Sequence, residues 1–146
     1  MLKRRILSVL LVLAMLVPFA GAAQTAQDNM RGVWVASVAN IDYPSSAGMT
    51  AQALAAEADT MLDNIAAMGL NTVFLQVRPA ADALYRSGLF PQSRYVSGTC
   101  GASPDGDFDV LAYWVEGAHE RGLQLHAWIN PYRITRNGRA EPDALP

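Results

Sequence analysis

The chain has 146 residues, a formal net charge of −2 and 51% hydrophobic residues, which is the composition of a globular protein. Its arginines beyond the first five residues are scattered singly, so no basic patch indicates nucleic acid or an anionic membrane surface as a partner. Cys100 is the only cysteine and excludes an internal disulfide. We expect it to be a bystander in a glycine-rich loop rather than a catalytic thiol.

Residues 1–23 have the pattern of a secretory signal peptide. The basic residues Lys3, Arg4 and Arg5 precede an apolar run over 6–17, and small residues follow at 20–23. The run is too short to span a bilayer as a mature helix, although an uncleaved anchor is the alternative. We therefore predict a signal peptide over 1–23, a short linker over 24–29 and an exported protein, periplasmic or extracellular, associated with the cell envelope and without a membrane anchor. Removing the three cations would change the net charge from −2 to −5.

The remaining chain alternates predicted strands with predicted helices. Strands are predicted over 31–38, 70–77 and 123–129. One helix is predicted from an N-cap at Thr50 to about residue 68, ended by Gly69, and a second begins at Asp109 and ends before Gly122. The residues expected to face the core are Leu54, Ala58, Met61, Leu62 and Ile65 in the first helix, and Leu111, Trp114, Val115 and Ala118 in the second. Alternating strands and helices indicate an α/β fold with parallel strands.

A loop of about thirty residues separates the second strand from the second helix, which is long for a compact domain and indicates a functional loop. Strand alternation predicts two different sheet faces. The residues expected under the helices are Asn71, Val73, Leu75, Val77, Leu123, Leu125, Ala127 and Ile129. The residues expected on the opposite face are Trp34, Ala36, Val38, Thr72, Phe74, Gln76, Arg78, Gln124, His126, Trp128 and Asn130. A register slip by one residue near Pro79 or Pro131 stays open.

Rings, amides and guanidinium groups follow the ends of the predicted strands, and such groups suit a neutral, hydroxyl-rich ligand such as a sugar. Structural alternatives stay open: Trp128 filling the interior, His126 as a core histidine, Arg78 and Asp82 as an ion pair, and Arg133 as a solvated residue. His119 and His126 lack metal-ligand spacing, and the sequence has no glycine-rich phosphate loop. Neither a metal nor a cofactor is therefore predicted.

Three segments, 31–45, 76–85 and 126–133, resemble the glycosyl-hydrolase-like family 10. The resemblance implies an exported bacterial protein with a (β/α)8 barrel that hydrolyses cell-envelope glycan, with peptidoglycan glycan strands as the leading substrate. Such a barrel needs eight strands and roughly 250 residues. We therefore expect residues 30–146 to be the first three β/α units of a larger enzyme, and we expect them to fold poorly when expressed alone.

The resemblance and the strand ends together predict eight substrate-binding residues: Asn40, Asp42, Arg78, Asp82, Trp128, Asn130, Tyr132 and Arg133. Glycoside hydrolysis usually needs two carboxylates, and the resemblance implies an Asp-Asp motif after the fourth strand, beyond residue 146. Asp82 is the best catalytic candidate present, although we expect it to position the substrate. A non-catalytic glycan-binding protein on the same scaffold and a metal-dependent barrel hydrolase are the alternatives. Retaining or inverting stereochemistry and the oligomeric state stay open.

Overall fold

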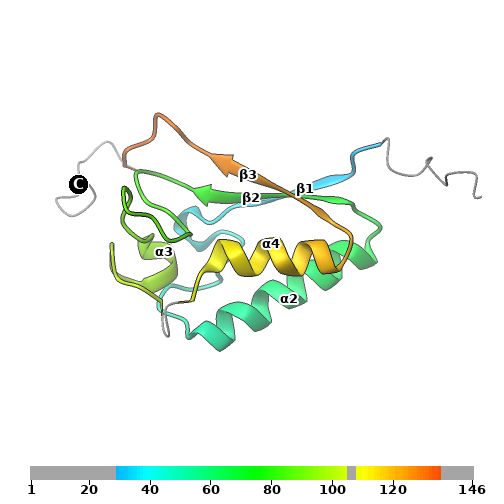
Figure 1. Cartoon of the computed structure of the whole chain (residues 1–146), viewed down its shortest axis with the longest axis horizontal. Helices are drawn as coiled ribbons and strands as arrows, with labels where there is room; N and C mark the ends of the chain where they lie inside the picture. The colour runs from blue at the N-terminus through cyan, green and yellow to red at the C-terminus, as the bar shows by residue number, and fades with distance from the viewer. Residues whose placement is uncertain (1–28, 105–107, 136–146) are drawn as a thin grey trace, which may run out of the picture.

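The computed structural model describes residues 29–104 and 108–135 of the chain (Figure 1). The signal peptide predicted over 1–23 lies outside these residues. Within them, no helix is both long enough and apolar enough to cross a membrane.

Three parallel strands form one sheet: β1 (Gly32–Val35), β2 (Thr72–Arg78) and β3 (Gln124–Ile129). Their order is β1-β2-β3, so β2 lies in the middle. Val33 of β1 pairs with Val73 of β2, which pairs in turn with Leu125 of β3. The predicted α/β class with parallel strands is therefore confirmed, for a small sheet with helices.

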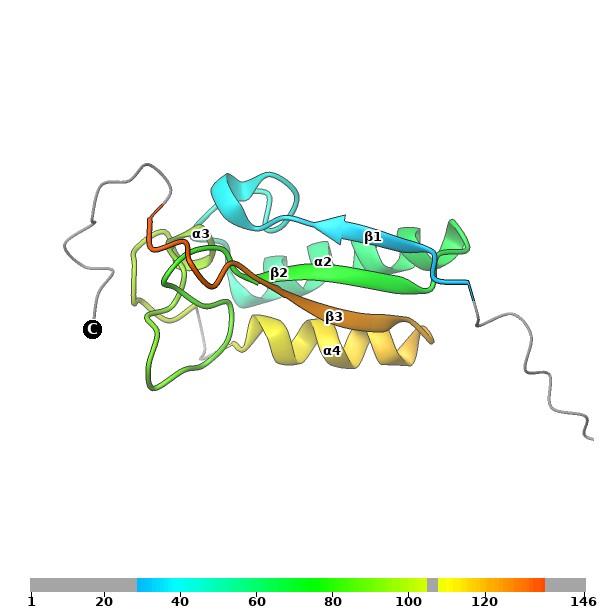
Figure 2. The same cartoon turned by 90° about the horizontal axis from the view of Figure 1, so that it is seen from above.

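Two helices, α2 (Ala51–Ala67) and α4 (Val110–Glu120), lie on the same face of this sheet (Figure 1). Viewed from above, the other face has no described element in front of it (Figure 2). The described part of the chain is thus a two-layer structure, because its helices cover only one side of the sheet.

The helix boundaries follow the signals in the sequence. Thr50 Oγ1 accepts a hydrogen bond from the Ala53 N–H at 3.2 Å, and Asp109 Oδ1 accepts one from the Ala112 N–H at 3.0 Å. Both side chains satisfy an N–H group that a helix leaves without a partner at its first turn. Gly69 follows the end of α2 with φ +73°, a conformation that costs glycine no Cβ clash. Both predicted N-caps are therefore confirmed, and so is the terminator of α2.

The core lies between the helices and the aliphatic side of the sheet. Its fully buried members include Leu54, Ala58 and Leu62 of α2, Val73, Leu75 and Val77 of β2, and Trp114 and Ala118 of α4. The predicted inward face of α2 is confirmed, with Met61 half-buried. On α4, Trp114 and Ala118 are buried as predicted, whereas Val110 and Gly117 are also buried and Leu111 and Val115 are only half-buried.

Gly117 explains why the buried face of α4 is rotated from the prediction. A Cβ atom at Gly117 would lie only 3.0 Å from Leu62 Cδ1, so the missing side chain allows α2 and α4 to approach closely. Next to this contact, Trp114 packs edge-on against the buried ring of Tyr43 with centroids 4.9 Å apart. Burial raises the pKa of the Tyr43 phenol far above its usual value, and its hydroxyl donates to the Leu54 carbonyl.

Polar contacts join the outer sides of the two helices. The Tyr113 hydroxyl donates to Asp59 at 2.7 Å, and this hydrogen bond raises the pKa of the Tyr113 phenol. Arg121 Nε donates to Asp63 at 2.7 Å, which raises the pKa of the guanidinium, and Arg121 Nη2 lies 3.1 Å from Asp59. These contacts are partly solvent-exposed, so apolar burial rather than ion pairing provides most of the stability here.

The structure corrects the end of the first strand and adds one short helix. The first strand ends at Val35 rather than at residue 38, because the chain turns into a short 3-10 helix, η1 (Val38–Asn40). The long loop after β2 contains a four-residue helix, α3 (Arg94–Ser97), which was not predicted. The buried Ser93 caps α3, and its side chain accepts from the Tyr95 N–H at 3.3 Å.

We predict that Trp114→Ala lowers the free energy of unfolding of the full-length protein by about 3–5 kcal/mol, because it leaves a large cavity beside Tyr43. Urea unfolding followed by circular dichroism would measure the change. Met68→Ala is the control, since Met68 is 65% exposed, and it should shift stability by less than about 0.5 kcal/mol. Equal losses in the two variants would contradict this description of the core.

Candidate functional site

All three strands point the same way, so their carboxyl ends lie at one edge of the sheet (Figure 2). The loops that follow β1, β2 and β3, together with η1 and α3, gather at this edge. Parallel α/β folds place their binding groups at this edge, because there the loops of successive units meet. All eight predicted site residues lie in β2 or β3 or follow a strand end.

The loop after β1 is held by Gln76, which is fully buried in β2. Gln76 Oε1 accepts hydrogen bonds from the backbone N–H groups of Ser37 at 3.0 Å and of Val38 at 2.9 Å. The Ser37 hydroxyl also donates to the Gln76 carbonyl at 2.8 Å. After Val35, β1 no longer pairs with β2. The hydrogen bonds of Gln76 hold the chain there instead, and they fix where η1 begins.

Asn40 lies at the end of η1 with a left-handed backbone, φ +53°. Its side-chain N–H₂ group donates to the carbonyls of Pro44 at 2.8 Å and of Tyr95 at 2.7 Å, which joins the first loop to α3. Both amide donors of Asn40 are therefore used within the protein. Its carboxamide oxygen is the atom that could still accept from a ligand.

Asp42 closes the same loop. One carboxylate oxygen accepts from the Ala36 N–H at 2.7 Å, and the Asp42 N–H donates back to the Ala36 carbonyl at 3.0 Å. Asp42 remains exposed to solvent. One carboxylate oxygen of Asp42 makes this structural contact. Asp42 also lies at the site edge, as the predicted contact with substrate requires.

Arg78 ends β2 and Asp82 lies in the loop that follows, but their side chains do not form the ion pair that the sequence left open. The Arg78 guanidinium lies over the Phe90 ring, with its central carbon 3.7 Å from the ring centroid. Asp82 is only 7% exposed, and its Oδ1 accepts from the Ala80 N–H at 3.0 Å. Asp82 therefore stabilises the turn after β2, and Arg78 contacts the long loop.

The end of β3 is joined to the end of β2 through Asn130. Its backbone N–H donates to the Arg78 carbonyl at 3.1 Å, and its side-chain N–H₂ donates to the Pro79 carbonyl at 3.1 Å. Trp128 Nε1 donates to Asn130 Oδ1 at 3.0 Å, so the indole ring and the amide hold one another. The structure thus brings Arg78, Trp128 and Asn130 together, as the strand alternation predicted.

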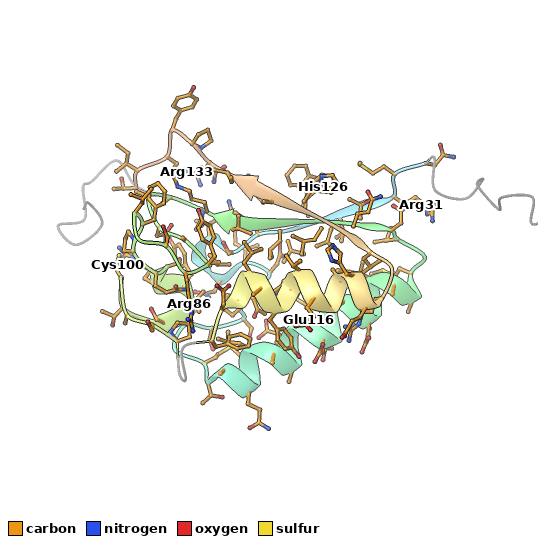
Figure 3. The ribbon with its side chains drawn as sticks, viewed as in Figure 1. Arg31, Arg86, Cys100, Glu116, His126 and Arg133 are labelled. Atoms are coloured by element: carbon orange, nitrogen blue, oxygen red, sulfur yellow. The ribbon has the colours of Figure 1, made fainter. Side chains whose placement is uncertain are left out.

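Tyr132 and Arg133 lie beyond β3 and are exposed, with Tyr132 97% accessible. Arg133 is near the long loop that carries Arg86 and Cys100, whereas Arg31 lies at the opposite end of the sheet (Figure 3). The backbone around Arg133 is held by a hydrogen bond from its N–H to the Asn130 carbonyl at 3.3 Å. Both side chains are therefore available to solvent at the site edge.

The sheet face without helices carries a row of rings. Trp34 stacks on Phe74 with centroids 4.6 Å apart and meets Trp128 edge-on at 5.2 Å. His126 lies against Phe74 at 5.1 Å and is exposed on this face, so in the described structure it is not a buried core histidine. The predicted division into an aliphatic face and an aromatic, polar face is confirmed for β2.

The register changes where the sequence left a slip open. Gln76 pairs with Trp128 and Arg78 pairs with Ile129, so β2 has one extra residue, Val77, at this point. Such an irregularity redirects the strand end. No local sequence signal predicts the contact between Arg78 and Phe90 or the role of Gln76 in the first loop, because both depend on residues distant in the chain.

The described residues contain no group of three or more histidine, cysteine, aspartate or glutamate residues that could hold a metal ion. The site edge instead presents amides, a guanidinium, a carboxylate and aromatic rings. These groups donate and accept hydrogen bonds and pack against sugar rings. The fold and this edge define a parallel α/β protein whose strand ends carry groups suited to carbohydrate recognition.

Comparison with known proteins agrees with this description. The family described as "Glycosyl hydrolase-like 10" matches residues 29–145, and the chain belongs to this family. Among its relatives, "Glycosyl hydrolase YngK" of Bacillus subtilis (strain 168) is 45% identical over 121 residues, covering 83% of this chain and 23% of that protein. "Glycosyl hydrolase DigH" of Escherichia coli (strain K12) is 35% identical over 136 residues, covering 85% of this chain and 30% of that protein. The chain therefore spans less than a third of either relative.

We predict that Gln76→Ala in the full-length protein lowers the free energy of unfolding by about 2–3 kcal/mol, because it leaves the Ser37 and Val38 N–H groups without their acceptor. Gln76→Glu keeps an acceptor oxygen and should lose less. Urea unfolding measures both changes, and the exposed Gln52→Ala is the matched control with an expected change below about 0.5 kcal/mol. If Gln76→Ala matched Gln52→Ala, the hydrogen bonds of Gln76 would not hold the first loop.

Proposed function

We propose that this chain is the N-terminal part of a (β/α)8 barrel in an exported glycoside hydrolase, which acts on cell-envelope glycan and specifically on peptidoglycan glycan strands. The observation that carries the proposal is the convergence of Arg78, Trp128 and Asn130 at the carboxyl edge of a parallel sheet, in a chain of the glycosyl hydrolase-like family. Its support is twofold: the geometry suits sugars, and the relatives are called glycosyl hydrolases.

The uncovered sheet face supports the barrel. Trp34 is 58% exposed and stacks with Phe74 on a face that no described helix covers. A (β/α)8 barrel buries such a face in its interior, where layers of side chains from different strands pack together. In this proposal the row of rings forms part of the barrel interior, and the polar strand ends form part of its mouth.

In the proposed mechanism, two carboxylates outside this chain hydrolyse the glycosidic bond without a metal, one as general acid and the other as nucleophile or base. The residues of this chain bind and orient the sugar. Trp128 provides a flat apolar surface, Arg78 donates to substrate oxygens, and the Asn40 carboxamide oxygen accepts from a hydroxyl. Asp82 and the exposed Asp42, Tyr132 and Arg133 complete the substrate contacts.

Export is part of the proposal, since a cell-envelope glycan lies outside the cytoplasm. It is supported by the signal-peptide pattern at 1–23. Fractionating cells and sequencing the N-terminus of the exported protein would test it. A product that begins between residues 21 and 25 in the periplasm or medium supports export, and a cytoplasmic product that retains the segment contradicts it.

The hydrolase activity is tested by incubating the full-length protein with purified peptidoglycan and identifying soluble products by mass spectrometry. New reducing-end sugars with broken glycosidic bonds support the proposal. Products cleaved only in the peptides would contradict it. Binding of glycan without any product would instead favour a non-catalytic glycan-binding protein on the same scaffold, because a fold does not by itself determine activity.

We predict that Asp82→Asn in the full-length protein lowers kcat/KM on peptidoglycan by about tenfold, because its carboxylate stabilises the turn after β2 and contacts substrate rather than donating the catalytic proton. Steady-state kinetics on soluble glycan fragments measure the change. Asp63→Asn, an exposed position on α2 far from the strand ends, is the control and should leave kcat/KM unchanged. A loss of several orders of magnitude in kcat with unchanged binding would instead make Asp82 the general acid.

A further inference from the structure

Arg78 is charged and partly buried, and it has no counter-ion among the described residues. Its guanidinium lies over the Phe90 ring, and its Nε is buried without a hydrogen-bond partner in the part of the chain that the structure describes. No carboxylate in the described part of the chain forms an ion pair with it, whereas Arg121 is paired with Asp59 and Asp63. Because a buried donor without a partner is unfavourable, Arg78 is a position where the described part of the chain leaves an interaction unmade.

Three acidic side chains in the loops that follow the strands, and at the start of α4, accept hydrogen bonds from nearby backbone N–H groups. Asp82 accepts from the Ala80 N–H through Oδ1, Asp42 accepts from the Ala36 N–H, and Asp109 caps α4. Each of these carboxylates stabilises a local turn or a helix end. The positive charge of Arg78 is therefore left for a group that comes from outside the described chain.

The contact with Phe90 determines how Arg78 can bind. A guanidinium that stacks on a ring uses its flat face, so its N–H donors remain directed in its own plane. That plane fits a planar acceptor with two oxygens, which is the geometry of a carboxylate. The backbone of Arg78 is fixed as well, since its carbonyl accepts from the Asn130 N–H at 3.1 Å.

We propose that Arg78, held by Phe90, binds a carboxylate of the glycan substrate, so that the site is selective for acidic glycans over neutral ones. This inference rests on the proposed function, because it identifies the substrate class of the same site. The carboxylate belongs either to a sugar unit or to a peptide attached to it, since both present the same planar anion. A phosphate is less suited, because phosphate sites usually combine several cations or a cradle of backbone N–H groups.

The test compares two forms of one substrate with the full-length protein. Soluble peptidoglycan fragments are used with free carboxylates, and after carbodiimide coupling to methylamine, which neutralises the carboxylates. For the unmodified protein, neutralisation should raise KM by about thirtyfold with little change in kcat, because the contact contributes to binding. Fragments whose only carboxylates are on the sugar and fragments whose only carboxylates are on the peptide distinguish the sources, each compared with its methylamide form: selectivity for the first places the carboxylate on the sugar, and selectivity for the second places it on the peptide.

The variants assign this selectivity to Arg78. Arg78→Gln should raise KM on the free-carboxylate fragments by about the same factor and should no longer distinguish the two substrate forms, since the two changes remove one interaction. Phe90→Leu keeps an apolar contact but loses the ring face and should lose part of the selectivity. Arg31→Gln is the matched control, because Arg31 is an arginine at the opposite end of the sheet (Figure 3) and should retain full selectivity.

Four results would decide against the inference or separate it from the proposed function. Equal KM for both substrate forms in the unmodified protein overturns it, and so does full selectivity in a folded Arg78→Gln variant. If the protein does not cleave the fragments, calorimetry measures their binding instead. Tighter binding of the free-carboxylate form that is lost in Arg78→Gln supports the inference, although the proposed hydrolysis is then contradicted. If neither fragment is cleaved or bound, both proposals fail. If Arg78→Gln folds poorly, Arg78→Lys is used in its place. It keeps the positive charge but lacks the planar guanidinium, so it should retain only part of the selectivity.

Discussion

The structure depends on the position of β2 between two parallel neighbours. On one side of this strand, Val73, Leu75 and Val77 are almost completely buried beneath α2 and α4. On the other side, Phe74 supports the row of rings and Gln76 holds the first loop. Because one strand stabilises the core, the uncovered face and the site edge, a change in its register would alter all three at once.

Gln76 shows how a buried polar group can determine local structure at the site. Burying an amide is favourable only when its atoms are hydrogen-bonded. The Oε1 atom of Gln76 meets this condition with two backbone N–H groups, but its Nε2 atom is buried without a partner in the described structure. The hydrogen bonds of Gln76 therefore determine positions in the first loop. The loop begins at a defined residue, and Asn40 is held where its side chain reaches the Tyr95 carbonyl. An aliphatic side chain at position 76 could fill the same space but could not fix that loop.

The sequence predicted the elements whose signals are local. Thr50 and Asp109 cap helices through contacts three residues away, Gly69 ends a helix by its own backbone freedom, and alternation along β2 separates Val73 and Leu75 from Phe74. The missed features depend on contacts between distant residues. The end of β1 at Val35 depends on Gln76, some forty residues later in the chain. Likewise, α3 is too short for a periodic signal, and the buried face of α4 depends on a glycine facing Leu62.

For the site, the local signals identified the edge but not the state of each side chain. Strand endings at Arg78 and Ile129 placed the polar groups correctly, since parallel strands end at one edge. Whether Arg78 paired with Asp82 could not follow from their spacing of four residues, because a loop places no fixed distance between them. The structure resolves this through Phe90, an unremarkable residue in the sequence that lies under the guanidinium.

The two faces of the sheet differ in how far the described chain covers them. The aliphatic face is stabilised within the described chain, where α2 and α4 remove it from water. Among the described residues, Trp34 on the aromatic face is exposed, Arg78 has no ion-pair partner, and the side-chain oxygen of Asn40 accepts no hydrogen bond. Stability alone would favour pairing or covering these groups. In the proposed function, these groups contact other strands of a barrel and the substrate.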